Sequence, residues 1–338
     1  MNYYYNQNPL VYLLEKYPDK NWRWDFISGN PNIIMEYIEN NPEKPWEWRY
    51  ISYNPNITIE FLETNIKKPW EWRYVSGNPN IIMEYIDKYP NNPWDWSYIS
   101  QNPNITIEFL ETNIEKPWDW FYVSGNPNIT MEFVKKYIDK RWSFMYISAN
   151  SNITMEDIER HPEMHWNWEY ISHNSNLTME MIEKYPNKPW DWIAISINEN
   201  ITIEDIKKHP EKPWNWDYIS RNPNLTIEFI ENHIEKPWNW EDISTNENIT
   251  TEDIEKYPEM HWNWRGISRN ENLTIEFIEN NIEEINFRHL SMNGFIYQNK
   301  LNRQQYLKHS LWILENTNTK TKHRLPRMVN MHIVKQYL

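Results

Sequence analysis

Few residues of the chain have the types and spacing that catalysis or metal binding needs. His161 and His165 stand four residues apart, a separation at which two imidazoles on one helix could share a metal ion. Pro162 lies between them and would interrupt the helix that aligns the two rings. The recurring glutamates are separated by whole 24-residue intervals, so they form a line along the chain and not the facing pair of carboxylates that acid–base catalysis requires. We therefore predict neither a metal site nor a catalytic site.

Other reactive groups and motifs are absent from the sequence. The 338 residues include no cysteine, which excludes disulfides, thiolate metal ligands and cysteine nucleophiles. There is no glycine-rich phosphate loop, Gly-x-Ser-x-Gly elbow or His-Glu-x-x-His helix, and five glycines leave little room for strained turns. We expect a protein without enzymatic activity, cofactor or small-molecule substrate.

Aromatic residues are the ones that recur at a fixed spacing. Tryptophan occurs at eleven positions 24 residues apart, and a second aromatic residue follows two positions later each time. The first column is Trp22, Trp46, Trp70, Trp94, Trp118, Trp142, Trp166, Trp190, Trp214, Trp238 and Trp262. A stacking platform for nucleic-acid bases would use such rings, but it would not need both columns filled in every unit. A continuous core would, so we interpret the pairs as core residues.

Each interval contains the signals of two short helices. Thr58 is placed to accept hydrogen bonds from the first amides of a helix, and Glu60 favours its positive dipole end, which predicts a helix near 59–66. Pro69 suits the first position of a second helix, which we predict over 69–76, with its class, α or 3₁₀, left open.

One unit has too few residues to enclose a core, so neighbouring units must stack. The sequence predicts an all-α superhelical solenoid of about eleven 24-residue two-helix repeats with a C-terminal helical cap. With helices packed roughly 8 to 10 Å apart, an open array would be on the order of 100 Å long. We divide the chain into an N-terminal capping helix with the first Trp helix (1–29), the repeat array (30–284) and a basic C-terminal segment (285–338).

The run Ser-x-Asn-Pro-Asn-Ile-Thr-x-Glu, followed by a second short helix, resembles the leucine-rich repeat variant family over roughly residues 8–291. That family alternates an α-helix with a 3₁₀-helix in 24-residue units, so the resemblance implies a superhelical fold. The Trp pairs depart from its pattern, and the cysteines of its iron–sulfur site are missing, so only the fold is carried over. The chain is also similar to uncharacterised Pro-Trp-x-Trp repeat proteins of giant DNA viruses, which implies work in the host cytoplasm, in a viral or host–virus complex.

Four polar columns keep one residue type in all eleven units, represented by Ser52, Asn54, Asn56 and Glu60. They could form a ligand-binding ladder. We favour a structural role, because short polar side chains at turns and helix starts satisfy backbone groups that stacking would otherwise bury unpaired.

Partner recognition is expected where the residue type changes from unit to unit. Two such columns flank the second helix, one through Arg49 and one through Tyr53. On one surface they would form a stripe for an extended or helical partner, although solvated positions free to vary would look the same. The partner-binding candidates are Arg49, Arg73, Phe121, Met145, Glu169, Ile193, Asp217, Glu241, Arg265 and Arg269.

The charge changes sign along the chain. Residues 1–284 hold 25 Lys and Arg against 47 Asp and Glu, whereas residues 285–338 hold nine against one. The acidic array repels phosphate. The C-terminal cluster of Lys320, Lys322, Arg324 and Arg327 could dock on the array or bind nucleic acid. We predict a non-catalytic scaffold for protein–protein interaction, and the alternative is RNA binding through this segment and surface arginines.

No stretch approaches the roughly 18 to 20 apolar residues of a membrane helix, and the N-terminus lacks a basic segment followed by an apolar one. We expect no membrane association, no secretion and a cytoplasmic location.

Overall fold

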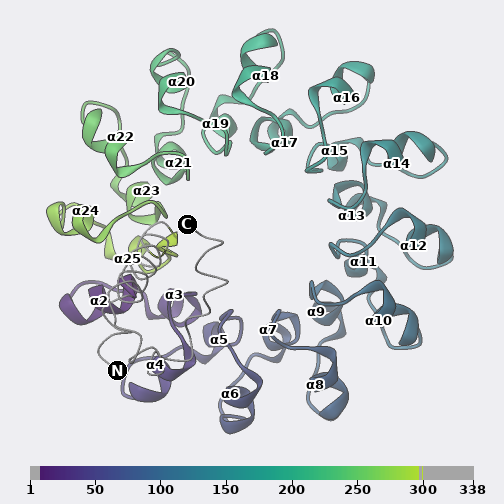
Figure 1. Ribbon diagram of the computed structural model, residues 1–338, viewed down its shortest axis with the longest axis horizontal. Helices are drawn as coiled ribbons and strands as arrows, with labels where there is room; N and C mark the ends of the chain where they lie inside the picture. The colour runs from purple at the N-terminus through teal and green to yellow at the C-terminus, as the bar shows by residue number, and fades with distance from the viewer. Residues whose placement is uncertain (1–7, 297–298, 300–338) are drawn as a thin grey trace, which may run out of the picture.

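The computed structural model describes residues 8–296 and residue 299, and these form 24 short helices and no strand. The helices alternate between an outer and an inner position (Figure 1). The outer helices are α2 (Pro9–Lys16), α4 (Met35–Asn40), α6 (Ile59–Thr64), α8 (Met83–Lys88), α10 (Ile107–Thr112), α12 (Met131–Lys136), α14 (Met155–Arg160), α16 (Met179–Lys184), α18 (Ile203–Lys208), α20 (Ile227–Glu231), α22 (Thr251–Lys256) and α24 (Ile275–Asn280). The inner helices are α3 (Trp24–Gly29), α5 (Trp48–Ile51), α7 (Trp72–Gly77), α9 (Trp96–Gln101), α11 (Trp120–Val123), α13 (Phe144–Ala149), α15 (Trp168–Ile171), α17 (Trp192–Ile197), α19 (Trp216–Ile219), α21 (Trp240–Thr245), α23 (Trp264–Arg269) and α25 (Phe287–Leu290).

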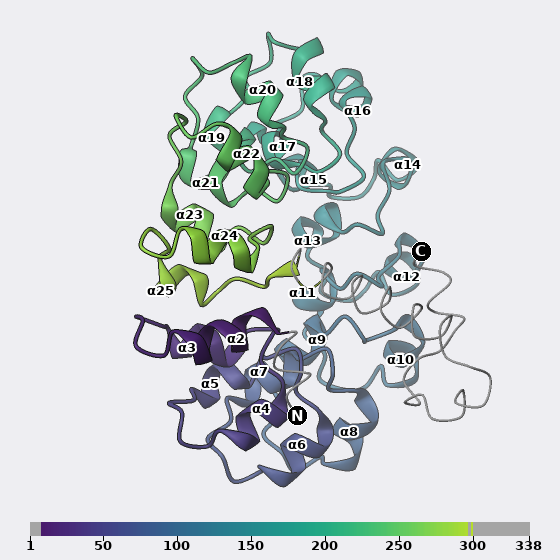
Figure 2. The same ribbon diagram turned by 60° about the vertical axis from the view of Figure 1, so that its left-hand side comes forward.

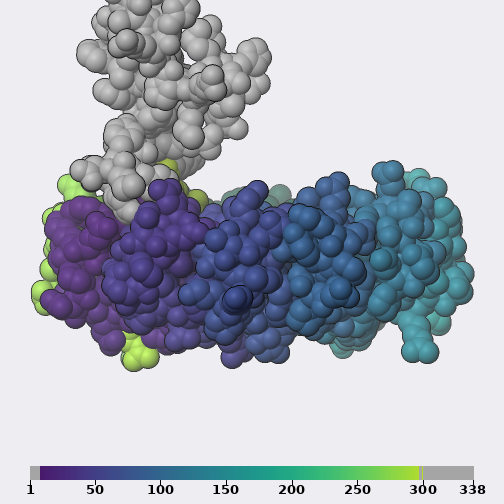
Figure 3. Space-filling view, turned by 90° about the horizontal axis from the view of Figure 1, so that it is seen from below, coloured from purple at the N-terminus to yellow at the C-terminus, as the bar shows by residue number. Residues whose placement is uncertain are grey.

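The helix pairs stack side by side into a closed ring. Inner helices surround a central opening and outer helices form the rim (Figure 1), and seen from the edge the ring is a flat band (Figure 3). The prediction of an all-α repeat solenoid is confirmed. The expectation of an open, elongated array is wrong, because the array curves until its two ends meet.

The outer helices begin where the sequence predicts. In α6 the Thr58 hydroxyl accepts a hydrogen bond from the Phe61 amide at 3.1 Å, and Glu60 lies in the first turn. Phe61 and Leu62 are buried against neighbouring units. The helix ends at Thr64, two residues earlier than predicted, since Asn65 leaves the helical conformation.

The inner helices start later than the proline suggested. The inner helix α7 begins at Trp72 and not at Pro69, and its N-cap residue, Glu71, has an extended backbone. The preceding segment is a turn in which the Trp70 amide donates to the carbonyl of Lys68 at 2.8 Å. The indole N–H of Trp70 holds this turn by donating to the carbonyl of Asn65 at 2.9 Å. The inner helices are α-helical, with four to six residues each.

The recurring serine and asparagine residues join consecutive units. The Ser52 hydroxyl donates to the carbonyl of Trp48 at 2.8 Å and accepts the amide of Glu71 from the next unit at 2.9 Å. The Asn54 side-chain amide donates to three carbonyls of the preceding unit, those of Ser28, Asn30 and Ile33, at 2.9 to 3.1 Å. Both side chains are fully buried. These contacts confirm that the columns satisfy backbone groups.

The first Trp column belongs to the core. All eleven of its indole N–H groups donate to the carbonyl five residues earlier, at 2.7 to 2.9 Å. Rings of the second column pack edge-on against the first-column ring of the next unit, as Trp48 does on Trp70 with centroids 5.0 Å apart. The interpretation of the Trp pairs as core residues is confirmed.

The ring closes at a seam between α24–α25 and α2–α3, which lie next to each other (Figures 1 and 2). The Arg23 amide donates to the Ser291 hydroxyl at 2.9 Å, and the Asn30 side chain donates to the carbonyls of Ser291 and Asn293 at 3.1 and 3.0 Å. Lys16 pairs with Glu279 at 2.5 Å. The same columns pair inside the array, where Lys88 meets Glu63 at 3.2 Å. The seam therefore repeats the contacts of an internal junction.

The ends of the repeat array meet in the ring and do not form free, capped ends. We predicted that the N-terminal helix caps a free end of the array. In the structure α2 is instead the outer helix of an additional unit, and its Tyr12 hydroxyl reaches Glu279 of the last outer helix at 2.8 Å. Helix α25 begins at Phe287, 23 residues after Trp264, so the repeat is one residue shorter here. With α25, the described residues form twelve helix pairs. Of the predicted C-terminal segment, 285–338, the structure describes residues 285–296 and 299, which include α25; the rest of the predicted cap lies outside the described residues.

Candidate functional site

The two variable columns lie on the inner helices. Around α5, Ile51 and the C-cap residue Ser52 are buried, whereas Arg49 and Tyr53, the residue after the C-cap, are exposed. Helix α5 is one of the inner helices that surround the central opening (Figure 1). We call the exposed surface of the inner helices, with the residues directly after them, the inner wall.

Five large apolar side chains are exposed in the two variable columns of the inner wall. Phe121, Met145 and Ile193 are 45, 41 and 44% exposed, and they occupy the Arg49 column. Tyr53 and Met292, at 41 and 37%, occupy the other column. Exposed apolar residues grouped on one surface are typical of interaction sites.

Several charged candidates already contact groups of their own chain. Arg269 pairs with Glu241 at 2.9 Å, although sequence analysis treated the two as independent partner contacts. Arg73 lies 3.4 Å from Glu71, and Arg49 donates to the Tyr74 hydroxyl at 3.4 Å. The other candidates, Glu169, Asp217 and Arg265, are exposed.

A third column of the inner wall was missed by sequence analysis. It follows the Arg49 column by one position and is aromatic in eight units: Phe26, Tyr50, Tyr74, Tyr98, Tyr122, Tyr146, Tyr170 and Tyr218. These rings are half-buried. Its 24-residue recurrence was the available signal, and the more regular Trp columns obscured it.

The aromatic column links neighbouring units. Phe26 and Tyr50 lie 6.3 Å apart between ring centroids, and Tyr74 and Tyr98 lie 6.1 Å apart. Exposed Phe121 packs edge-on against Tyr146 of the next unit at 4.9 Å. The result is a band of aromatic surface along part of the wall.

Arginines of the chain cover some rings of this column. The guanidinium of Arg23 lies 4.5 Å from the centre of Phe26, and that of Arg73 lies 5.1 Å from the centre of Tyr74. Arg221 lies 5.2 Å from the centre of Tyr218 and pairs with Asp242 at 2.7 Å. Such cation–π contacts occupy ring faces that a partner would otherwise meet.

The last part of the wall has no room for the aromatic column. Gly266 takes the position, and a β-carbon there would lie 2.4 Å from the carbonyl oxygen of Glu241 and 2.8 Å from the β-carbon of Ser244. Helices α21 and α23 thus approach too closely for any side chain at this point. Asp242 takes the same position in the preceding unit and pairs with an arginine instead.

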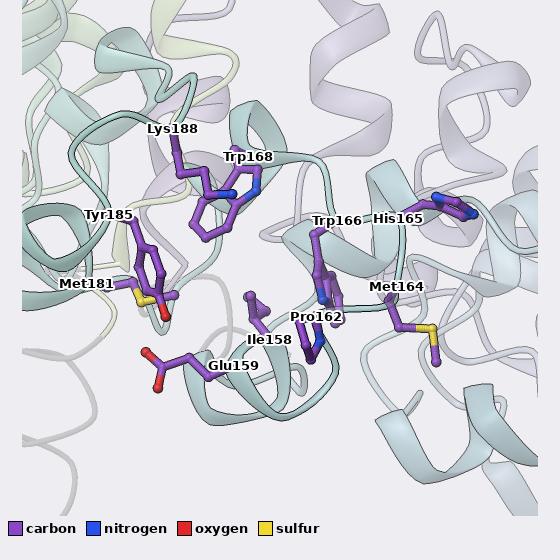
Figure 4. A pocket seen from close by; sticks show the side chains of 10 residues that line it. All are labelled: Ile158, Glu159, Pro162, Met164, His165, Trp166, Trp168, Met181, Tyr185 and Lys188. Carbon is purple, nitrogen blue, oxygen red and sulfur yellow. The ribbon is translucent and has the colours of Figure 1, made fainter.

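A cavity of about 230 Å³ lies away from the inner wall, between units around α14 and α16 (Figure 4). It is lined by Ile158, Glu159, Pro162, Met164, His165, Trp166, Trp168, Met181, Tyr185 and Lys188. The Lys188 ammonium lies 4.6 Å from the Trp168 ring centre, and five units earlier Lys68 covers Trp48 at 5.1 Å beside an equivalent cavity. We interpret these cavities as grooves left by stacking, because they recur with the repeat.

The histidine pair does not share surroundings. His161 lies 3.2 Å from Glu163, whereas the His165 ring packs edge-on against Phe144 with centroids 6.0 Å apart. Within residues 8–296 and 299, no group of three or more His, Cys, Asp or Glu side chains is placed to hold a metal ion.

The nucleic-acid candidates Lys320, Lys322, Arg324 and Arg327 lie outside the described residues. In the part of the chain that the structure describes, no helix is both long and apolar enough to cross a membrane. No family model, curated protein or solved structure matches this chain.

Proposed function

We propose that the protein is a non-catalytic scaffold that binds a protein partner on the inner wall of its ring. The observation that carries the proposal is that exposed apolar side chains occur in two columns whose residue type varies from unit to unit. The buried serine and asparagine columns, which have a structural role, keep one residue type in all eleven units. Aromatic and methionine side chains are enriched where proteins bind each other.

Paired substitutions test this function. Phe121→Asp with Met145→Asp places two charges on the inner wall. Ile138→Asp with Ile234→Asp is the matched control, because these residues are 53 and 52% exposed but lie in turns after outer helices. Neither pair removes a buried side chain, so both proteins should fold.

The readout is capture of partners by the full-length chain from cells that express it naturally, with and without nuclease. We expect proteins that resist nuclease, remain with the Ile138/Ile234 control and disappear with the Phe121/Met145 variant. Equal retention by both variants would contradict binding at the inner wall. Material lost on nuclease treatment would favour nucleic-acid binding, the alternative function.

A further inference from the structure

Five consecutive inner helices differ from the rest of the wall in charge. The cation-free arc consists of α9, α11, α13, α15 and α17, the N-cap residue before each, and the residues up to 125 and 173 that follow the four-residue helices α11 and α15. We use this name because these residues include no Lys or Arg. The other seven inner helices with their flanking residues form the arginine arc, which holds Arg23, Arg49, Arg73, Arg221, Arg265, Arg269 and Arg288. In Figure 1 the cation-free arc lies across the opening from the seam.

The aromatic rings of the cation-free arc have no cation of their own. In the described part of the chain, no Lys or Arg lies over Tyr98, Tyr122, Tyr146 or Tyr170. In the arginine arc, Phe26 and Tyr218 each have one arginine over the ring and Tyr74 has two. Tyr50, the exception in the arginine arc, packs against Tyr53 at 5.8 Å. The cation-free arc therefore presents rings that no Lys or Arg covers; their neighbours are Phe121, edge-on to Tyr122 and Tyr146, and His173, 6.0 Å from Tyr170.

Carboxylates accompany these rings. Asp95 and Asp191 cap their helices through Oδ1, which accepts backbone amides at 2.9 to 3.3 Å. The Nε2 atom of His173 lies 3.8 Å from Oδ2 of Asp191. Asp119 caps α11 in the same way, and its Oδ2 accepts only the Ser97 hydroxyl, at 2.9 Å. Glu169 is exposed. The arc thus combines four acidic groups with aromatic rings, and its basic residues are limited to His173, with no Lys or Arg.

We propose that the cation-free arc binds an extended, arginine-bearing segment of a partner protein. A guanidinium stacks on aromatic faces and donates two parallel hydrogen bonds to a carboxylate, and the arc offers both groups side by side. The arginine arc shows the same chemistry satisfied within the chain, where Arg221 lies over Tyr218 and pairs with Asp242. Nucleic acid fits poorly, since the arc has no cation to meet phosphate.

This inference rests on the proposed function, because it names the partner of the same wall. The test uses the full-length chain and a fluorescein-labelled, acetylated peptide of four Arg-Ser repeats. The control peptide has citrulline in place of arginine, which keeps the shape and removes the charge. Binding is followed by fluorescence anisotropy at 0.15 M salt, where long-range attraction to the acidic ring is largely screened.

Two pairs of variants place the peptide on the arc. Tyr122→Leu with Tyr146→Leu removes ring faces but keeps apolar bulk, and Asp119→Asn with Glu169→Gln removes two charges while asparagine still caps α11. The matched controls are Tyr74→Leu, whose ring is already covered, and Glu132→Gln with Glu180→Gln, two exposed acids in the first turns of outer helices.

We expect the arginine peptide to bind and the citrulline peptide not to bind. Each arc variant should weaken binding about 10-fold or more, as loss of two cation–π contacts or two ion pairs implies, and each control should change it less than about 2-fold. Equal losses from the outer acids, or no loss from the tyrosine variant, would overturn the inference. If the peptide fails to bind while Phe121→Asp with Met145→Asp still abolishes partner capture, the scaffold function stands and only the arginine chemistry is wrong.

Discussion

The two arcs of the inner wall are built from the same repeat and differ in how their aromatic rings are used. In the arginine arc, guanidinium groups lie over Phe26, Tyr74 and Tyr218, and some also pair with acids such as Asp242. The cation-free arc holds four tyrosines and four carboxylates and contains no Lys or Arg. The difference shows that a repeat scaffold can cover the aromatic rings of one sector with its own arginines and leave those of another sector without a cation, while the core stays the same.

The largest expected effect is a loss of stability when a side chain is added at Gly266, where the arginine arc lacks an aromatic residue. Gly266→Ala should destabilise the protein by about 1–3 kcal/mol, because the new β-carbon would overlap the Glu241 carbonyl. The control is Gly125→Ala, where the nearest atom would lie 3.7 Å away. The midpoint of urea unfolding, followed by Trp fluorescence, measures both. A Gly266 variant as stable as the Gly125 variant would show that helix spacing does not exclude the aromatic column.

A second change would place an arginine in the cation-free arc, so that one of its tyrosine rings is covered as in the arginine arc. Ser97→Arg places a guanidinium where Arg49 stands in an earlier unit, so that it can cover Tyr122 and pair with Asp119. We expect affinity for the arginine peptide to fall about 10-fold, a change of about 1.4 kcal/mol. Ser97→Gln, which is neutral, is the control. Unchanged affinity in the arginine variant would mean that the uncovered ring faces are not the binding determinants.

Removing an arginine should lower the free energy of unfolding more where the arginine pairs with a largely buried carboxylate. Arg221→Ala leaves the Asp242 carboxylate, 15% exposed, without its cation, and we expect a loss of about 0.5–1 kcal/mol. Among the described residues, Arg49 forms its hydrogen bond and its cation–π contact with Tyr74 and has no ion pair within 4 Å, so Arg49→Ala should cost less, about 0.5 kcal/mol at most. Urea unfolding compares the two. The reverse order would argue that the ring contact, and not the ion pair, stabilises the arginine arc.

The smallest effect concerns pH. Burial, together with the nearby Glu247 carboxylate, raises the pKa of Glu271 beside the arginine arc. The folded state therefore binds this proton more tightly than the unfolded state, so its contribution is favourable at low pH and is lost as pH rises through the raised pKa. Other acids titrate as well, so the measurement is the difference in urea midpoint between wild type and Glu271→Gln. Relative to the variant, wild type should gain stability as pH falls from 7 toward about 4.3, the ordinary glutamate value. A constant difference would contradict the assignment.

Local features of the fold could be predicted from the sequence because each rests on neighbouring residues. The Thr58 cap, the buried Ser52 and Asn54 columns and the core position of Trp70 all follow from short-range chemistry repeated every 24 residues. The start of the inner helices was misplaced. Pro69 is compatible with a helix start, but the hydrogen bond from the Trp70 indole favours a turn that delays it.

Ring closure could not be predicted, because it depends on a small rotation summed over many units. Twelve units close a circle only if each turns by about 30° on average, and that angle comes from packing across every junction and not from any one residue. The division of the inner wall was hidden for a similar reason. Arg49 covers Tyr74 of the next unit, and such a contact can be predicted only when the stacking of the units is known.

Closure of the ring is the claim on which the inner wall depends, and a distance measurement tests it directly. The chain has no cysteine, so spin labels can be attached at chosen sites. Cysteines at the exposed positions Glu15 and Asn280 report across the seam, and cysteines at Asp87 and Thr64 occupy the same columns at an internal junction. Electron–electron resonance should give the same narrow distance distribution for both pairs. A long or broad distribution across the seam, with a narrow one inside the array, would show an open solenoid and contradict the account.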